Sequence, residues 1–211
     1  MSSLDLSDTL KQGLTTLGED PAAHPCDLYL QFIRELGKWN KAYNLTAIRD
    51  PERMITHHVL DSLSVLPFIH GKRCLDVGTG AGLPGMILAL ARPDTHWTLL
   101  DSKSKKVRFI QHLLREIKPE NVEVVHARVE AYQPEYEFST IITRALTTIA
   151  GFYRITTHLS GADSRLLAMK GDYPQQELSD LPAGHARVHQ LKVPGIDSSR
   201  HLVVITERSE S

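Results

Sequence analysis

The chain has 211 residues, a length that predicts one domain with room for a small extension. Its 24 Lys and Arg residues are balanced by 25 Asp and Glu residues, so net charge gives no support for a nucleic-acid partner. Hydrophobic residues make up 41% and charged residues 23%, which excludes disordered, collagen-like and coiled-coil proteins.

Targeting signals and cysteine usage favour an intracellular setting. The longest apolar stretch, Met86 to Ala91, is too short to span a membrane. The N-terminus has no basic segment ahead of an apolar one, and the two cysteines, Cys26 and Cys74, form no disulfide framework. We therefore expect a cytoplasmic, reduced protein without a membrane partner.

The first seventy residues have helical spacing. Apolar side chains from Leu28 to Tyr43 recur every three or four positions, and residues 4–17 show a weaker form of the pattern. Asp50 and Pro51 are typical of a helix start, and Ile55, Val59, Leu63 and Leu66 then mark one face of that helix. We expect residues 1–70 to form a helical extension that packs on the unit formed by residues 71–211.

From residue 71 onward, short β-rich runs alternate with helical stretches, which predicts an α/β fold with a doubly wound, mostly parallel sheet. The last two strands have only the loop 194–200 between them, so we expect an antiparallel pair at the sheet edge. The predicted strands are Arg73–Val77, Trp97–Leu100, Val122–Val125, Thr140–Thr143, Arg165–Met169, Val188–Val193 and Leu202–Thr206; the predicted helices are Leu83–Ala91, Lys103–Ile117 and Ile149–His158.

A glycine-dense turn follows the first of these strands. Four glycines fall within eight residues from Gly78 to Gly85, whereas a tight turn needs one or two. The run from Gly80 matches the GxGxxG dinucleotide fingerprint, with Asp101 placed for a ribose diol. Asp76, just before the loop, instead favours a cationic ammonium or sulfonium ligand, because a carboxylate there would repel a pyrophosphate.

The run from Asp76 to Gly82 resembles the first motif of class I S-adenosylmethionine-dependent methyltransferases. The resemblance implies a Rossmann-like, seven-stranded and mostly parallel sheet with an antiparallel strand at its edge. It also implies that Gly78, Gly80 and Gly82 leave space for the methionine part of the cofactor and that Asp101 takes the ribose hydroxyls.

The chemistry of the target is narrowed by motifs that the chain lacks. The fourth strand ends at Arg144 without the Asn/Asp-Pro-Pro-aromatic motif of amine-methylating enzymes, and neither cysteine is placed as a nucleophile. The N7 atom of guanine requires neither that motif nor a cysteine nucleophile, because its lone pair is free to attack the methyl group. Catalysis of this reaction depends mostly on proximity and orientation. Arg144 is placed to contact the cofactor or the base and to orient them for methyl transfer. The alternative is that Arg144 is an ordinary charged residue of the protein surface.

Motifs over most of the chain, from Trp39 to Ile205, resemble those of the bacterial 16S rRNA guanine-N7 methyltransferase family, also called glucose-inhibited division protein B. The motifs are Trp39-Asn-Lys-Ala-Tyr-Asn-Leu-Thr-Ala47, His58-Val-Leu-Asp-Ser62, Leu75 to Gly85, Leu99-Leu-Asp-Ser102, Thr143-Arg-Ala145, Met169-Lys-Gly171 and His201-Leu-Val-Val-Ile205.

Position by position, this resemblance assigns cofactor contacts to Gly78, Leu83, Val129, Glu130 and Arg144. It implies methylation of a guanine near the decoding centre, with 16S rRNA as partner, within a 30S particle or a precursor, and makes residues 71–211 the methyltransferase domain. Three positions depart from the family pattern. His57 stands where Arg is usual and makes a contact pH-dependent, Ala81 stands where many members have Pro, and Leu146 replaces an aromatic residue.

A local cluster of cations gives a candidate RNA surface that net charge conceals. Residues 102–118 carry six cations and one acid, and the run starts directly after Asp101, at the sheet edge where ligands bind. An ordinary solvated helix face is the alternative reading. The expected RNA contacts are Lys103, Lys105, Lys106, Arg108, His58 and Lys170, with Lys41, Arg49 and Arg53 nearby.

Other readings of the chain remain open at this stage. His57, His58 and Asp61 share a helical region, but methyl transfer needs no metal. We expect capping, packing or RNA contact for these residues and no metal. A nucleotide-dependent oxidoreductase is supported only by the GxGxxG match and Asp101. A non-catalytic RNA-binding module with a cofactor fold would bind the methyl donor without forming product.

Overall fold

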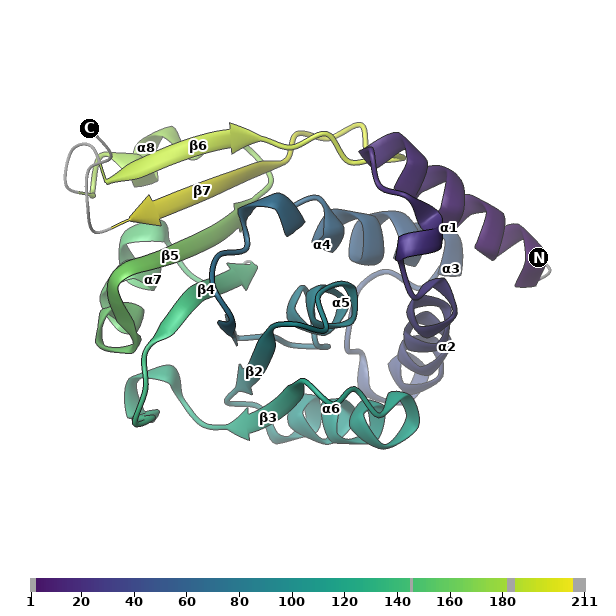
Figure 1. Ribbon diagram of the computed structural model, residues 1–211, viewed down its shortest axis with the longest axis horizontal. Helices are drawn as coiled ribbons and strands as arrows, with labels where there is room; N and C mark the ends of the chain where they lie inside the picture. The colour runs from purple at the N-terminus through teal and green to yellow at the C-terminus, as the bar shows by residue number, and fades with distance from the viewer. Residues whose placement is uncertain (1–2, 145, 182–184, 207–211) are drawn as a thin grey trace.

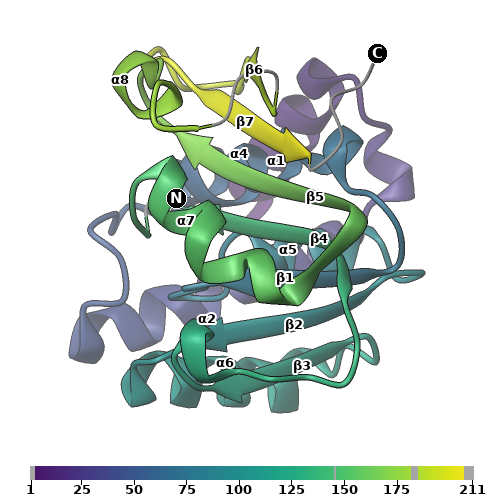
Figure 2. The ribbon, with the colours of Figure 1, turned by 90° about the vertical axis from the view of Figure 1, so that its left-hand side faces the viewer.

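The computed structural model describes residues 3–144, 146–181 and 185–206. Its centre is a seven-stranded sheet in the order β3-β2-β1-β4-β5-β7-β6 (Figure 2). The strands are β1 (Arg73–Val77), β2 (His96–Asp101), β3 (Val122–His126), β4 (Phe138–Arg144), β5 (Ser160–Lys170), β6 (Ala186–Gln190) and β7 (His201–Thr206).

Strands β1 to β5 are parallel, as the alternation of β and α segments predicted. The antiparallel pair β6 and β7 is also confirmed. This pair lies at the sheet edge as expected: β7 pairs with β5 over six residue pairs, and β6 is the outermost strand. The observed β6 also begins and ends earlier than the predicted strand Val188–Val193.

Helices cover both faces of the sheet. They are α1 (Ser3–Leu17), α2 (Cys26–Tyr43), α3 (Pro51–Met54), α4 (Asp61–Leu63), α5 (Gly85–Ala91), α6 (Ser104–Ile117), α7 (Ile149–Thr156) and α8 (Gln175–Leu178). Figure 2 shows α7 on the face toward the viewer and the N-terminal helices, in purple and blue, behind the sheet. None of the helices in the described ranges is long and apolar enough to cross a bilayer.

The N-terminal helices share a hydrophobic core with the sheet. Leu14 of α1 and Phe32 of α2 are fully buried in one cluster with Leu99 of β2 and Phe109 of α6. Figure 1 shows α2 lying beside α6. Burying each such side chain contributes about 1.5–3 kcal/mol. A second cluster, with Phe152 of α7 and Ile141 of β4, fills the other face.

The segment after α3 is a π-helix, Ile55–Leu60, which runs directly into α4. Asp50 caps α3 as predicted, because its Oδ2 accepts a hydrogen bond from the Arg53 N–H at 2.8 Å. Wider π turns are frequent at functional sites. Here the π segment carries His57 and His58 and delivers Asp61 to the carboxyl edge of the sheet.

Candidate active site

The loop after β1 is built around backbone conformations that favour glycine. Gly78 has a φ of +69°, and its N–H donates to the Leu100 carbonyl of β2 at 2.9 Å. A Cβ atom added at Gly78 would lie 2.7 Å from Cδ1 of Leu146. The loop therefore holds a bare stretch of backbone between the ends of β1 and β4.

Asp76 lies beneath this loop rather than in front of it. The side chain is fully buried; its Oδ2 accepts hydrogen bonds from the Thr79 hydroxyl at 2.6 Å and the Gly85 N–H at 2.8 Å. Burial raises the pKa of Asp76 to about 6, although these two donors and the Arg144 charge oppose the shift. Asp76 was expected to face a cationic ligand. In this structure Oδ2 is hydrogen-bonded to the loop, and Oδ1 has no hydrogen-bond partner in the described chain.

Asp101, at the end of β2, is placed to contact a ligand. Its Oδ2 accepts the Gly80 N–H at 2.8 Å and its Oδ1 accepts the Lys103 N–H at 2.7 Å. Each carboxylate oxygen retains a lone pair for a further donor. Asp101 lines a cavity of about 490 Å³, and the residue is 7% exposed.

This first cavity brings together four of the expected cofactor residues, namely Gly78, Asp101, Val129 and Glu130. Other residues that line this cavity were not among the expected cofactor contacts, and two further segments, 146–147 and 151–155, contribute some of them. They are Val77, Leu100, Ser102, Lys103, Ala127, Arg128, Leu146, Thr147, Gly151, Arg154 and Ile155.

Besides Asp76, four expected contacts do not line this cavity. Gly82 packs inward, since a Cβ atom there would lie 3.3 Å from Met86 Cβ, and Leu83 is 3% exposed within the core. Arg144 lines a different cavity. Gly80 acts beside the first cavity through its hydrogen bond to Asp101.

A second cavity of about 390 Å³ lies at the carboxyl ends of β4 and β5. Arg144 lines it, whereas Leu146 and Thr147 of the same segment line the first cavity. The other residues around it are Thr46, Ala47, Ile48, His57, His58, Asp61, Met169, Lys170, Gly171, Leu191, Arg200 and His201.

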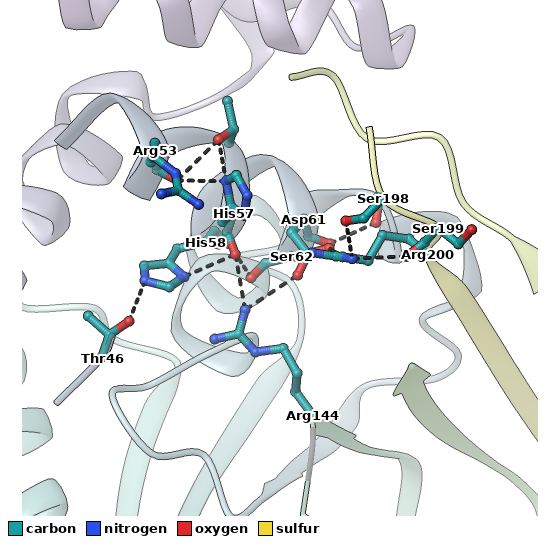
Figure 3. A network of polar contacts seen from close by, with 12 residues as sticks. Thr46, Arg53, His57, His58, Asp61, Ser62, Arg144, Ser198, Ser199 and Arg200 are labelled. Carbon is teal, nitrogen blue, oxygen red and sulfur yellow. Dashed lines mark hydrogen bonds and ion pairs between the residues drawn. The ribbon is translucent and has the colours of Figure 1, made fainter. Parts of the chain in front are cut away.

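Arg144 is not an isolated surface charge. Figure 3 shows its guanidinium turned toward the π segment, where Nη1 donates to the His57 carbonyl at 3.2 Å and lies 3.4 Å from Oδ2 of Asp61. Asp61 also receives Nε of Arg200 on its Oδ1, at 3.2 Å. Arg200 is a site residue that sequence reasoning did not single out.

His58 was expected to contact RNA, and the structure places it in the wall of the second cavity with little exposed surface. The side chain is buried, with Nε2 3.0 Å from the Thr46 hydroxyl. Burial, reinforced by the nearby Arg144 charge, lowers the pKa of His58 to about 4. A neutral, enclosed imidazole holds the loop that contains Thr46 and offers no charge to a phosphate.

Two of the expected RNA-binding lysines are engaged within the protein. Lys106 donates to the Leu45 carbonyl at 2.5 Å, and its partial burial lowers its pKa. Lys170 pairs with Glu177 at 2.8 Å and donates to the Thr147 carbonyl. Lys103, Lys105 and Arg108 are exposed on and beside the first turns of α6, as expected for an RNA surface.

In the described ranges, no group of three or more His, Cys, Asp or Glu side chains is arranged to hold a metal ion. The imidazole of His57 contacts the Arg53 carbonyl, and that of His58 contacts the His57 carbonyl and the Thr46 hydroxyl.

The sequence profile of the rRNA small subunit methyltransferase G family matches residues 26–203 of this chain. The chain belongs to this family. A ribosomal RNA small subunit methyltransferase G from Methylobacillus flagellatus is 45% identical over 203 residues, which cover 96% of this chain and 99% of that protein. The protein of the same name from Idiomarina loihiensis is 48% identical over 182 residues, or 85% of this chain and 88% of its own.

Solved structures show the same fold at low sequence identity. A SAM-dependent methyltransferase from Aquifex aeolicus superposes with a TM-score of 0.55 at 20% identity, covering 74% of this chain and 94% of its own. Aeropyrum pernix fibrillarin with bound S-adenosyl-L-methionine gives a TM-score of 0.56 at 12% identity, covering 70% and 73%. The expected class I methyltransferase fold is confirmed.

Proposed function

We propose that this protein transfers the methyl group of S-adenosylmethionine to N7 of a guanine in 16S rRNA, within a 30S particle or its precursor. The observation that carries the proposal is the pairing of two cavities at the end of β4 in a chain of this family. The first cavity suits a nucleoside-containing cofactor, and the second suits a base.

The residues of the first cavity fit S-adenosylmethionine. Asp101 offers free carboxylate lone pairs for ribose hydroxyls, and Val129 and Ile155 are apolar surfaces for an adenine ring. Gly78 keeps the floor of the cavity free of side chains beside Leu146. Asp76 supports the loop from below, so its role in this proposal is positioning rather than ligand contact.

Bound in this way, the cofactor supplies an electrophilic methyl group on a positively charged sulfur. The protein's own residues then have to present N7 in line with that methyl group and exclude water. Because the N7 lone pair must form the new bond, a guanidinium that reads the base must bind O6 alone and leave N7 free. Arg144, at the wall of the second cavity, is the residue to which we assign this contact.

No side chain has to remove a proton in this mechanism. N7 of guanine carries no proton, so the pKa of a general base does not enter the rate. The second cavity contains His58, but its depressed pKa keeps it neutral and its Nε2 faces Thr46. We assign it to the loop and not to the chemistry.

Affinity for rRNA would come from the exposed cations near the start of α6. Lys103, Lys105 and Arg108 stand directly after Asp101, so a bound backbone would pass beside the first cavity. Phosphate contacts of this kind give affinity without sequence information. Selection of the guanine is therefore assigned to the second cavity.

The test is nucleoside analysis after incubation with labelled methyl donor. Naked 16S rRNA, 30S particles and assembly precursors are compared, and 7-methylguanosine is expected in at least one of them. Methyl on a cytosine carbon, an exocyclic amine or a ribose oxygen would overturn the assignment. Binding of the methyl donor with no product on any substrate would favour the non-catalytic module.

A further inference from the structure

One carboxylate in the second cavity holds two arginines that come from distant parts of the chain. Asp61 follows the π segment, Arg144 ends β4, and Arg200 directly precedes β7. Asp61 lies 3.4 Å from Arg144 and 3.2 Å from Arg200, one arginine on each oxygen (Figure 3). The carboxylate therefore joins the N-terminal helices to two strands of the sheet.

Both arginines are fixed by a second anchor. Nη1 of Arg144 also donates to the His57 carbonyl at 3.2 Å, and Nη1 of Arg200 donates to Ser198 and Ser199 at 2.9 Å each. A guanidinium has five N–H donors, so each arginine keeps donors beyond these bonds. Their side chains are 25% and 22% exposed, which leaves part of each guanidinium open to the cavity.

Asp61 is too enclosed to take part directly. Its side chain is 6% exposed, and both oxygens are turned to the arginines. It is also the single carboxylate among the described residues that line this cavity, where Arg144, Lys170 and Arg200 supply three positive charges. Without it, two partly buried guanidiniums would lose the negative charge that they share, which is strongly unfavourable.

We propose that Asp61 is a positioning residue, which sets Arg144 and Arg200 as a fixed pair facing the target nucleotide. The inference rests on the proposed function and deepens it. Asp61 acts through the two guanidiniums and does not touch the base. Asp61 contributes to the rate by fixing the positions of the two guanidiniums, because a displacement of about 1 Å at the reacting centre costs on the order of a hundredfold in rate.

This role predicts opposite effects on binding and on rate. Asp61→Asn keeps the size of the side chain but removes its negative charge from a cationic wall, so RNA affinity should stay equal or rise a few-fold. The amide also presents N–H groups to one arginine, so the pair loses its alignment. Single-turnover methylation should therefore fall on the order of a hundredfold. Affinity for S-adenosylmethionine should stay within about twofold, because Asp61 does not line the first cavity.

Three variants separate positioning from general stability. Asp61→Glu keeps the charge and should recover part of the lost rate. Glu35→Gln is the matched control, since Glu35 is a buried acid that pairs with Lys38 and His112 away from both cavities. It should lower thermal stability without separating rate from RNA affinity. In an Arg144→Ala, Arg200→Ala background, Asp61→Asn should cause little further loss, because the residues through which it acts are gone.

Each methylation rate is divided by the concentration of S-adenosylmethionine-binding sites, which calorimetry measures. Unfolded protein then does not affect the comparison. A wild-type rate in Asp61→Asn would overturn the inference. So would weaker RNA binding with an unchanged single-turnover rate, or a full additional loss in the double-arginine background. If wild-type protein forms no 7-methylguanosine, the proposed function fails instead, and that outcome is read before any variant is compared.

Discussion

The carboxylate of Asp101 accepts a hydrogen bond from the backbone N–H of Gly80 at 2.8 Å, which joins the end of β2 to the loop after β1. A single side chain therefore fixes the loop and, in the proposed function, receives the ribose of the cofactor. We expect Asp101→Ala to weaken S-adenosylmethionine binding by about 1.5–3 kcal/mol, the usual cost of losing hydrogen bonds to a charged group. Titration calorimetry measures this directly.

Asp94→Ala is the control for this substitution, because Asp94 is an exposed acid that pairs with Arg92 outside the cavity. It should leave the cofactor affinity unchanged. Wild-type protein should show no comparable affinity for NAD. Tight NAD binding without binding of the methyl donor would restore the oxidoreductase reading.

Gly78→Ala should weaken cofactor binding more than it weakens the fold. The substitution forces a side chain into a φ of +69° at a cost of about 1–3 kcal/mol, and its Cβ would approach Leu146 to 2.7 Å. Leu146 is exposed and can shift, but it then moves within the first cavity. Denaturant melts and calorimetry of Gly78→Ala, alone and with Leu146→Ala, separate the two costs. The second substitution should restore part of the affinity and none of the stability.

Gly37→Ala should change the stability of the fold in the opposite direction from Gly78→Ala. Gly37 lies within α2, its added Cβ would meet no atom within 4 Å, and its backbone is not left-handed. The change should stabilise the protein by about 0.5–1 kcal/mol and leave methylation unaffected. A loss of activity there would show that the cavities depend on more than their lining residues.

Adjacent lysines of α6 should behave differently toward RNA. Lys105→Gln and Arg108→Gln should each reduce the slope of log affinity against log salt by about 0.7–0.9, because both side chains are exposed. Lys106→Gln should leave the slope nearly unchanged and lower the melting temperature, since Lys106 ties α6 to the Leu45 carbonyl. Filter binding over a salt series measures the slopes. Equal slopes for all three variants and the wild type would mean that these cations do not bind RNA and form an ordinary solvated helix face.

Local motifs carried most of what the sequence predicted correctly. The glycine loop, β1 and Asp101 depend on neighbours within a strand–turn–helix unit, where residue type and spacing are sufficient. Several contacts that the sequence did not predict join residues far apart in the chain. Arg144 and Asp61 are 83 positions apart, and no spacing rule relates them. Lys106 and Leu45 are 61 positions apart, so their hydrogen bond depends on the N-terminal helical extension lying against α6.

Burial also limited prediction for single polar residues. Asp76 was interpreted from the charge that a carboxylate carries in water, and His58 was placed among the expected RNA contacts. The structure places both in the interior, where desolvation raises one pKa and lowers the other. The helical pattern had marked Ile55 and Val59 as a buried face, and the π segment brings His58 into the interior beside them.

His58 should make the protein less stable in mild acid. Its pKa in the folded protein, about 4, lies below the ordinary value of 6.5. The stabilisation is therefore fully present above pH 6.5 and is lost as the pH falls toward 4, because the unfolded chain takes up a proton that the folded protein excludes. Between pH 7.5 and 5 the loss from this group is about 2 kcal/mol. Urea unfolding across this range, with His58→Gln as the comparison, isolates it.

The contribution of Asp76 to stability changes with pH in the opposite direction and has to be separated from that of His58. Its folded pKa of about 6 is raised, so its contribution is present below the ordinary value near 3.8 and is lost as the pH rises through 6. Because Asp76 is present in both wild type and His58→Gln, its contribution cancels in the difference between their pH profiles. That difference should grow steadily as the pH falls from 6.5 to 4. A flat difference would mean that His58 is protonated in the folded protein, with Thr46 and the His57 carbonyl holding an imidazolium beside Arg144.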